Sequence, residues 1–258
     1  MKKGSIFLCL LSVELENALA FSVSKRKGDI SLLSYEKSLQ DRGFPYIVGS
    51  DEVGRGAIAG PVVAASCCIV SERFTSTQPR HDSRDDSDFV AIAGVADSKQ
   101  LTEEERNQVF EQIIEEKDTY KWTYTERSPS DIDNSNILKA TMECFRESIQ
   151  NLILNEALPL ERTYAIVDGK STPKLVGGPT PVPCRPFVKA DEHVYVVAMA
   201  SIIAKVTRDE IMTEAHKQYP QYSFHVNKGY STREHIEAIH KYGPCPLHRM
   251  SFKALRNR

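Results

Sequence analysis

The sequence predicts an α/β fold in which a mixed β-sheet is covered by α-helices. Two runs of β-branched and small apolar residues, at 46–50 and 61–70, are separated only by a glycine-rich turn. Further strand-like runs then alternate with segments of helical periodicity, up to a long Ala-rich helix expected at 194–212. Strands joined by a short turn are antiparallel, whereas strands separated by helices can pair in parallel, so a mixed sheet is favoured.

The region after the second strand is expected to hold an insertion and then a helix. Residues 71–88 are rich in Ser, Thr, Arg and Asp without any period, which is typical of an inserted polar loop. Thr102 is expected to open a helix, because Glu105 three residues later completes a capping box. The apolar stripe of this helix consists of Val109, Phe110, Ile113 and Ile114.

The second half of the chain predicts the remaining strands and helices. Strands are expected at 121–126, at 164–167 before Asp168-Gly169, and just ahead of Lys189-Ala190-Asp191. Helical spacing of apolar residues is found at 137–152. A last amphipathic helix is expected from Ser231, with Glu234 as its capping partner, to His240.

Composition and charge leave the class of partner open. The formal charge is only -2, although the segment from Lys205 to the C-terminus holds ten Lys/Arg against five Asp/Glu. Such an excess is more typical of a solvated surface than of a phosphate track when nothing else supports it. The six cysteines form no C-x-x-C pair, which disfavours a zinc site, and no apolar run reaches the roughly 18 residues that span a bilayer.

Residues 1–30 are expected to be a leader or targeting extension. Lys2 and Lys3 precede an apolar run at 6–13, and Ala18-Leu19-Ala20 has the small-x-small form of a signal-cleavage site. The Phe21 that follows, and a Ser/Lys/Arg segment without acids, are similar to the two-part leaders of algal plastid proteins. We therefore favour import into a plastid of a eukaryotic alga. The alternative is a disordered extension on a cytoplasmic or nuclear protein.

Four acids at strand exits are candidate metal ligands: Asp51, Glu52, Asp168 and Asp191. Taken singly, each is more typical of a turn former or a helix cap. Taken together they suit Mg²⁺, which prefers oxygen ligands, and two such ions can hold the attacking and leaving oxygens of a phosphodiester displacement. Neighbouring residues of a strand point to opposite faces, so we expect the strand to break at Asp51 and Glu52, before Gly54-Arg55-Gly56.

A series of motifs resembles the bacterial-type ribonuclease HII family. The string YIVGSDEVGRGAIAGPVVAA begins at Tyr46, and the likeness recurs in the order DSKQLTEEER, NILKAT, VDG, KAD, ASIIAKVTRD, KGYST and GPCPLHRMSF. It covers about residues 33–252 and is broken mainly by the 71–88 insertion. The resemblance implies a ribonuclease H-like fold, a five-stranded mixed β-sheet flanked by α-helices, with residues 31–258 as the catalytic domain.

The resemblance also implies roles for single residues. Asp51, Glu52, Asp168 and Asp191 match the family's metal-binding acids, with Mg²⁺ or Mn²⁺, one or two ions per site, as the cofactor. Gly54, Arg55 and Gly56 match the loop that reads the ribose 2′-hydroxyl through its backbone, the group that separates RNA from DNA. Tyr230 matches the ring that packs on the next deoxyribose, and without the resemblance it would be interpreted as a half-buried core residue.

Basic residues and departures from the family pattern complete the candidate site. Lys99 and Lys205 are candidate phosphate contacts, although a solvated surface lysine is the commoner situation. His248-Arg249 are either a structural pair or contacts to a substrate strand. Gln100 replaces a basic residue of the family, and Glu192 and His193 stand beside Asp191, where small or basic residues are common.

The expected activity is hydrolysis of the RNA strand of RNA–DNA hybrids, including single ribonucleotides embedded in duplex DNA. The products are expected to be 5′-phosphate and 3′-hydroxyl ends, and the enzyme a monomer without membrane association that acts in primer removal and ribonucleotide excision. One alternative is another ribonuclease H-like nuclease, such as a transposase or resolvase, which would not need the GRG and KGY motifs. The other is a non-catalytic subunit that binds hybrids, against which the presence of all four acids argues.

Overall fold

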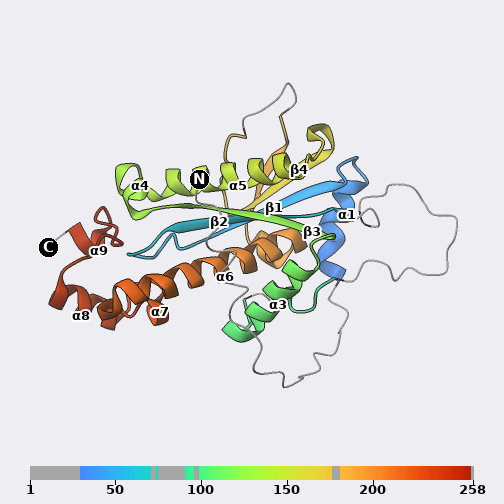
Figure 1. Ribbon diagram of the computed structural model, residues 1–258. Coiled ribbons are helices and arrows are strands. Elements are labelled where there is room, and N and C mark those ends of the chain that lie inside the picture. Colours follow the sequence, from blue (N-terminus) through green and yellow to red (C-terminus); the bar gives the residue numbers. More distant parts are fainter. Residues whose placement is uncertain (1–29, 71–73, 75–90, 96–98, 176–180, 257–258) are drawn as a thin grey trace, which may run out of the picture.

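A five-stranded mixed sheet forms the centre of the molecule (Figure 1). The computed structural model describes residues 30–70, 74, 91–95, 99–175 and 181–256. The expected leader at 1–30 and the insertion at 71–88 therefore lie almost wholly outside the described residues. The strands are β1 (Tyr46–Val53), β2 (Val62–Ile69), β3 (Tyr120–Arg127), β4 (Thr163–Asp168) and β5 (Cys184–Phe187). They lie in the order β3-β2-β1-β4-β5, antiparallel from β3 to β1 and parallel from β1 to β5.

Helices cover both faces of this sheet (Figure 1). The long helix α6 (Tyr195–Gln218) packs across β1 and β2 on one face, with α1 (Ser34–Gln40) and α3 (Glu103–Glu115) beside it. On the other face α5 (Ile137–Asn155) packs on β2 and β3, preceded by the short α4 (Pro129–Asn134). Gly49 lets β1 and α6 touch, since a Cβ there would lie 2.5 Å from the backbone of Val196. This close approach ties the strand to the start of the helix.

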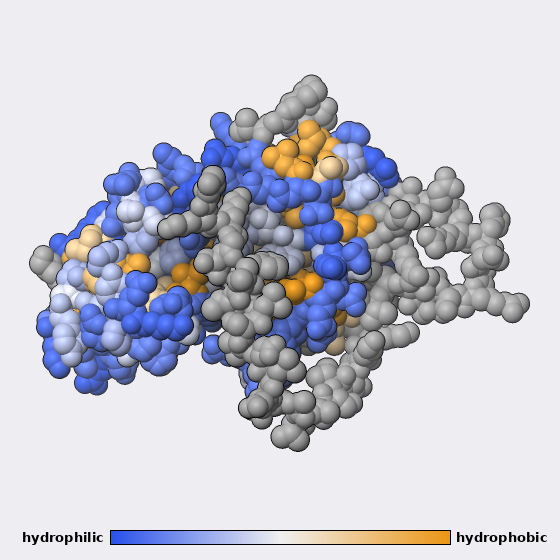
Figure 2. All heavy atoms as spheres, viewed as in Figure 1, coloured by the Kyte–Doolittle hydropathy of each residue, from blue (hydrophilic) through white to orange (hydrophobic). Residues whose placement is uncertain are grey.

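The C-terminal helices form a third cluster beyond the end of the sheet (Figure 1). They are α7 (Phe224–Asn227), α8 (Arg233–Tyr242) and α9 (Lys253–Arg256). Their shared core includes Phe224 and Ile239 together with Met212 of α6 and Ile58 of the segment after β1. The outer surface of this region is mostly hydrophilic (Figure 2). No helix among the described ranges is long and apolar enough to cross a membrane.

Most predicted elements are confirmed, with three corrections. The capping box of Thr102 and Glu105 is present at the start of α3. The last helix begins one residue later than expected, because Thr232 rather than Ser231 accepts the hydrogen bond from the amide of His235. β1 does not break at Asp51 and Glu52, since pairing with β2 keeps it extended to Val53. The short helices α1, α4, α7 and α9 were not predicted.

Candidate active site

The four predicted carboxylates lie around the ends of two neighbouring parallel strands. Asp51 and Glu52 lie near the end of β1, and Asp168 is the last residue of β4. Asp191 lies in the turn η4 (Ala190–Glu192), and the amide of Ala190 in this turn donates a hydrogen bond of 2.6 Å to Asp168 Oδ1. That bond joins the end of β4 to the turn that carries the fourth acid.

Neighbouring acids of this set raise one another's pKa. Burial raises the pKa of Asp51 well above its usual range, and the charges of Glu52 and Asp168 raise it further. Burial also raises the pKa of Glu52, and the charge of Asp168 adds to this effect. The pKa of Asp168 is raised by burial and, in addition, by the charge of Asp191. Negative charges that raise one another's pKa are stabilised when a divalent cation binds between them.

Two of the four acids bind cationic side chains. Arg55 Nη1 lies 2.9 Å from Glu52 Oε1, and Lys99 Nζ lies 2.9 Å from Asp191 Oδ2. The described ranges contain no group of three or more His, Cys, Asp or Glu side chains placed to hold a metal ion. The donor set still fits a hard divalent cation, because all four groups are carboxylates and their charges already oppose one another. A cation that bound there would replace Arg55 and Lys99 as the neutralising charge.

A basic pocket of about 180 Å³ opens beside the carboxylates. It is lined by Glu52, Val53, Lys99, Arg106, Ser201, Ile202 and Lys205. Sequence reasoning missed Arg106 and Ser201. Ser201 forms a hydrogen bond with Asp51, which lowers the pKa of that acid and opposes the effect of burial. Its four-residue spacing from Lys205 on the predicted helix was a signal that both side chains share one face.

Two buried arginines bind the backbone of the loop Gly54-Arg55-Gly56 and of the segment that follows it. Arg208 of α6 donates through Nε to Pro61 O and through Nη2 to Ala59 O, at 2.9 and 3.1 Å. Arg249 donates through Nε to Gly60 O at 2.9 Å and through Nη1 to Arg55 O at 3.2 Å. Arg249 is 0% exposed, so of the two possibilities for His248-Arg249 the structural one is correct.

Tyr230 lies on a second loop that is joined to the first. The carbonyl of Gly229 accepts hydrogen bonds from the amides of Ile58 and Ala59, at 2.9 and 3.1 Å. The guanidinium of Arg208 lies 5.5 Å from the centre of the Tyr230 ring and also donates to Lys228 O. Tyr230 is 38% exposed, so it is not a core residue and offers a surface for stacking.

Comparisons with known proteins decide the family. Residues 48–255 match the family Ribonuclease HII. A ribonuclease HII from Caldanaerobacter subterraneus is 40% identical over 218 residues, which cover 84% of this chain and 78% of the relative. The chain belongs to the ribonuclease HII family. It is a metal-dependent endonuclease that hydrolyses the RNA strand of RNA–DNA hybrids.

Solved structures agree with the fold. The ribonuclease H2 from Pyrococcus horikoshii superposes with a TM-score of 0.60 at 25% identity, covering 82% of this chain and 96% of that one. Bst ribonuclease HIII, crystallised in complex with Mn²⁺, gives a TM-score of 0.60 at 19% identity over 84% of this chain and 70% of its own. The predicted ribonuclease H-like fold is confirmed, and the transposase or resolvase alternative is disfavoured.

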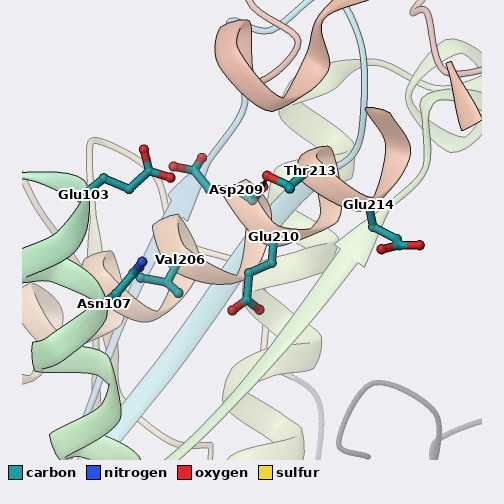
Figure 3. A pocket seen from close by; sticks show the side chains of 7 residues that line it. All are labelled: Glu103, Asn107, Val206, Asp209, Glu210, Thr213 and Glu214. Atoms are coloured by element: carbon teal, nitrogen blue, oxygen red, sulfur yellow. Dashed lines mark hydrogen bonds between the residues drawn. The ribbon is translucent and has the colours of Figure 1, made fainter. Parts of the chain in front are cut away.

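A second pocket lies between α3 and α6 and is acidic (Figure 3). It has a similar volume, about 180 Å³, and is lined by Glu103, Asn107, Val206, Asp209, Glu210, Thr213 and Glu214. Two of its acids hold lysines of the recognition motifs. Asp209 pairs with Lys205 at 2.7 Å, and Glu103 pairs with Lys228 at 3.4 Å. Its negative charge disfavours phosphate, so a nucleic-acid backbone is expected to follow the basic pocket instead.

Proposed function

We propose that Asp51, Glu52, Asp168 and Asp191 hold one or two divalent cations, Mg²⁺ or Mn²⁺, at the cleavage site. The proposal is carried by the cluster of mutually opposed carboxylates beside a basic pocket. The Mn²⁺ complex of the related fold is consistent with this chemistry. When bound, such cations polarise a scissile phosphate and lower the pKa of an attacking water.

The side chains around the carboxylates then position the substrate. Lys99, Arg106 and Lys205 line the basic pocket, and their positive charges support contacts to phosphates of the cleaved strand. Lys99 Nζ lies 2.9 Å from Asp191 Oδ2, so this lysine links the basic pocket to one of the four carboxylates. Ser201 orients Asp51 through its hydrogen bond. Hydrolysis on the 5′ side of a ribonucleotide then gives a 3′-hydroxyl and a 5′-phosphate.

Recognition of the ribonucleotide falls to the two joined loops. The backbone of Gly54-Arg55-Gly56 would contact the ribose 2′-hydroxyl, and Tyr230 would pack on the sugar of the following deoxyribonucleotide. Because Arg208 and Gly229 bind these loops to each other, the two contacts are held at a fixed separation. This supports selection of single ribonucleotides embedded in DNA.

The test is cleavage of a duplex that carries one ribonucleotide, with Mg²⁺ or Mn²⁺, and mapping of the product ends. Asp51→Asn should reduce cleavage by more than about 100-fold while duplex binding survives, since it removes a cation ligand and not a phosphate contact. Glu210→Gln is the matched control, because it removes one acid from α6 outside the proposed site. Cleavage by Asp51→Asn within tenfold of wild type would refute the assignment.

A further inference from the structure

A buried carboxylate outside the proposed site binds the first turn of α6. Glu36 of α1 is 0% exposed, and its Oε1 accepts a hydrogen bond of 3.0 Å from the amide of Val196. The amide of Tyr195 also hydrogen-bonds to this carboxyl group. These two residues begin α6, and the preceding residue, Val194, supplies no side-chain cap. Glu36 therefore caps the helix from a distant part of the chain.

This cap does more than fill space in the core. The first amides of a helix have no acceptor within it and carry partial positive charge, so a carboxylate binds them well. Burial nevertheless raises the pKa of Glu36 to about 7, and its Oε2 has no hydrogen-bond partner among the described residues. An apolar side chain would fill the same space without this desolvation cost. The carboxyl group is thus suited to holding the helix end in place.

The start of α6 is also where three parts of the proposed site meet. The amide of Val194 donates to Ala190 O at 2.8 Å, which links the helix to the turn that carries Asp191. On the other side the backbone of Val196 touches β1 at Gly49, two residues before Asp51. A shift of the helix end would therefore move Asp191 relative to Asp51.

We propose that Glu36 is a positioning residue of the nuclease, which sets the separation of Asp191 from the carboxylates of β1 and β4 by fixing the first turn of α6. The inference rests on the assignment of these carboxylates as cation ligands. Glu36 itself touches neither substrate nor cation. Its effect passes through the backbone of 190–196 and should be seen in cation binding before any nucleic acid is added.

The experiment measures Mn²⁺ binding by calorimetry without nucleic acid, together with kcat and KM on an RNA–DNA hybrid. Glu36→Ala should weaken Mn²⁺ binding and lower kcat by about 10- to 100-fold, the range found when groups that orient metal ligands are removed. KM for the hybrid should change less than about threefold, because all side chains of the basic pocket and of the two loops are retained. Glu36→Gln, whose amide oxygen can still accept from Val196, should recover most of both losses.

Asn136→Ala is the matched control for lost helix stability. Asn136 caps α5 on the opposite face of the sheet, where its side chain accepts from the amide of Lys139 at 2.9 Å. This variant should lose thermal stability but keep wild-type Mn²⁺ binding and kcat. A folded Glu36→Ala with wild-type Mn²⁺ affinity, or an equal loss of affinity in Asn136→Ala, would overturn the proposal.

Two further variants decide the remaining cases. If Glu36→Ala does not fold, Glu36→Asp replaces it, since the shorter side chain keeps the charge but draws it away from Val196. Weaker Mn²⁺ binding by Glu36→Asp than by Glu36→Gln supports positioning, and equal binding overturns it. Asp191→Asn tests the assignment beneath the proposal. If Asp191→Asn loses Mn²⁺ and Glu36→Ala does not, only the role of Glu36 is wrong.

Discussion

Replacing either glycine of the Gly54-Arg55-Gly56 loop by alanine should impair the enzyme, but for a different reason at each position. Gly54 has φ +91°, and a Cβ there would lie 2.2 Å from Nε of Arg208. Gly56 has no such positive φ, and a Cβ there would meet no atom of the described residues within 4 Å. Glycine at position 54 is thus needed for the fold to form. Glycine at position 56 is not needed for the fold, so we expect it to matter for contact with the substrate.

The expected magnitudes follow from these contacts. Gly54→Ala places a side chain in the left-handed region, which costs about 1–2 kcal/mol, and displaces an arginine whose hydrogen bonds are worth about 1.5–3 kcal/mol each. A loss on the order of 4 kcal/mol lowers the melting temperature by roughly 8–16 °C for a domain of this size. Gly56→Ala should change stability by less than about 1 kcal/mol, and can increase it by restricting the unfolded chain.

Gly56→Ala should lose much activity even though it loses little stability. A methyl group at Gly56 holds the loop away from any ribose, and a displacement near 1 Å can cost about 100-fold in rate. Gly56→Ala should therefore cleave both a continuous hybrid and a single-ribonucleotide duplex about 10- to 100-fold more slowly, at fixed salt. Wild-type cleavage by this variant would show that the Gly56 backbone does not contact the ribose. A melting temperature as low as that of Gly54→Ala would refute the steric argument.

Three other predictions follow from the site and its surroundings. Tyr230→Ala should lower cleavage at a single embedded ribonucleotide more than cleavage within continuous RNA, by about 1–3 kcal/mol of lost stacking, and equal losses on both duplexes would make the ring a packing residue. The pKa of Glu36 is raised by burial to about 7, so its contribution to the free energy of unfolding, up to about 3 kcal/mol, is full below pH 4.5 and lost as pH rises through 7. Denaturation of Glu36→Gln between pH 4.5 and 8 should show a shallower fall in stability than wild type, and parallel curves would contradict this. A fluorescent fusion of residues 1–45 should enter a plastid in an algal cell, whereas diffuse signal would place the enzyme in the cytoplasm or nucleus.

Local signals predicted most of the sheet and the major helices. The strands and α5 carry strong apolar patterns, and α3 begins with a capping box whose two hydrogen bonds involve neighbouring residues. Such features depend on a few consecutive side chains and can be recognised without knowing the fold. The helix α1 is different, because it is only seven residues long and its central acid is buried against α6. Its stability comes from tertiary contacts, which periodicity does not reveal.

The four acids of the site could be recognised from the sequence, but the buried residues that hold the surrounding backbone could not. Asp51, Glu52, Asp168 and Asp191 each stood at the end of a strand or just after one, where clustering at one sheet edge is expected. Glu36 lies 160 positions from the amide that it caps. Arg208 and Arg249 were harder to recognise, because arginine is rarely fully buried and both belong to a segment interpreted as a basic surface. Only the fold shows that their partners are backbone carbonyls.

The buried arginines explain how a loop of three residues can present its backbone to a substrate. Burial and the nearby charge of Arg208 lower the pKa of Arg249 to about 9, so keeping this guanidinium charged in the interior costs free energy. It binds the carbonyl of Arg55, and the described peptide bonds are all trans. In a trans peptide the N–H points opposite to the C=O, so a carbonyl of Arg55 turned toward the interior directs the amide of Gly56 outward. A Cβ at Gly56 would meet no atom of the described residues within 4 Å, so there is room beside this residue, and an outward amide could donate to a 2′-hydroxyl without any movement of the loop.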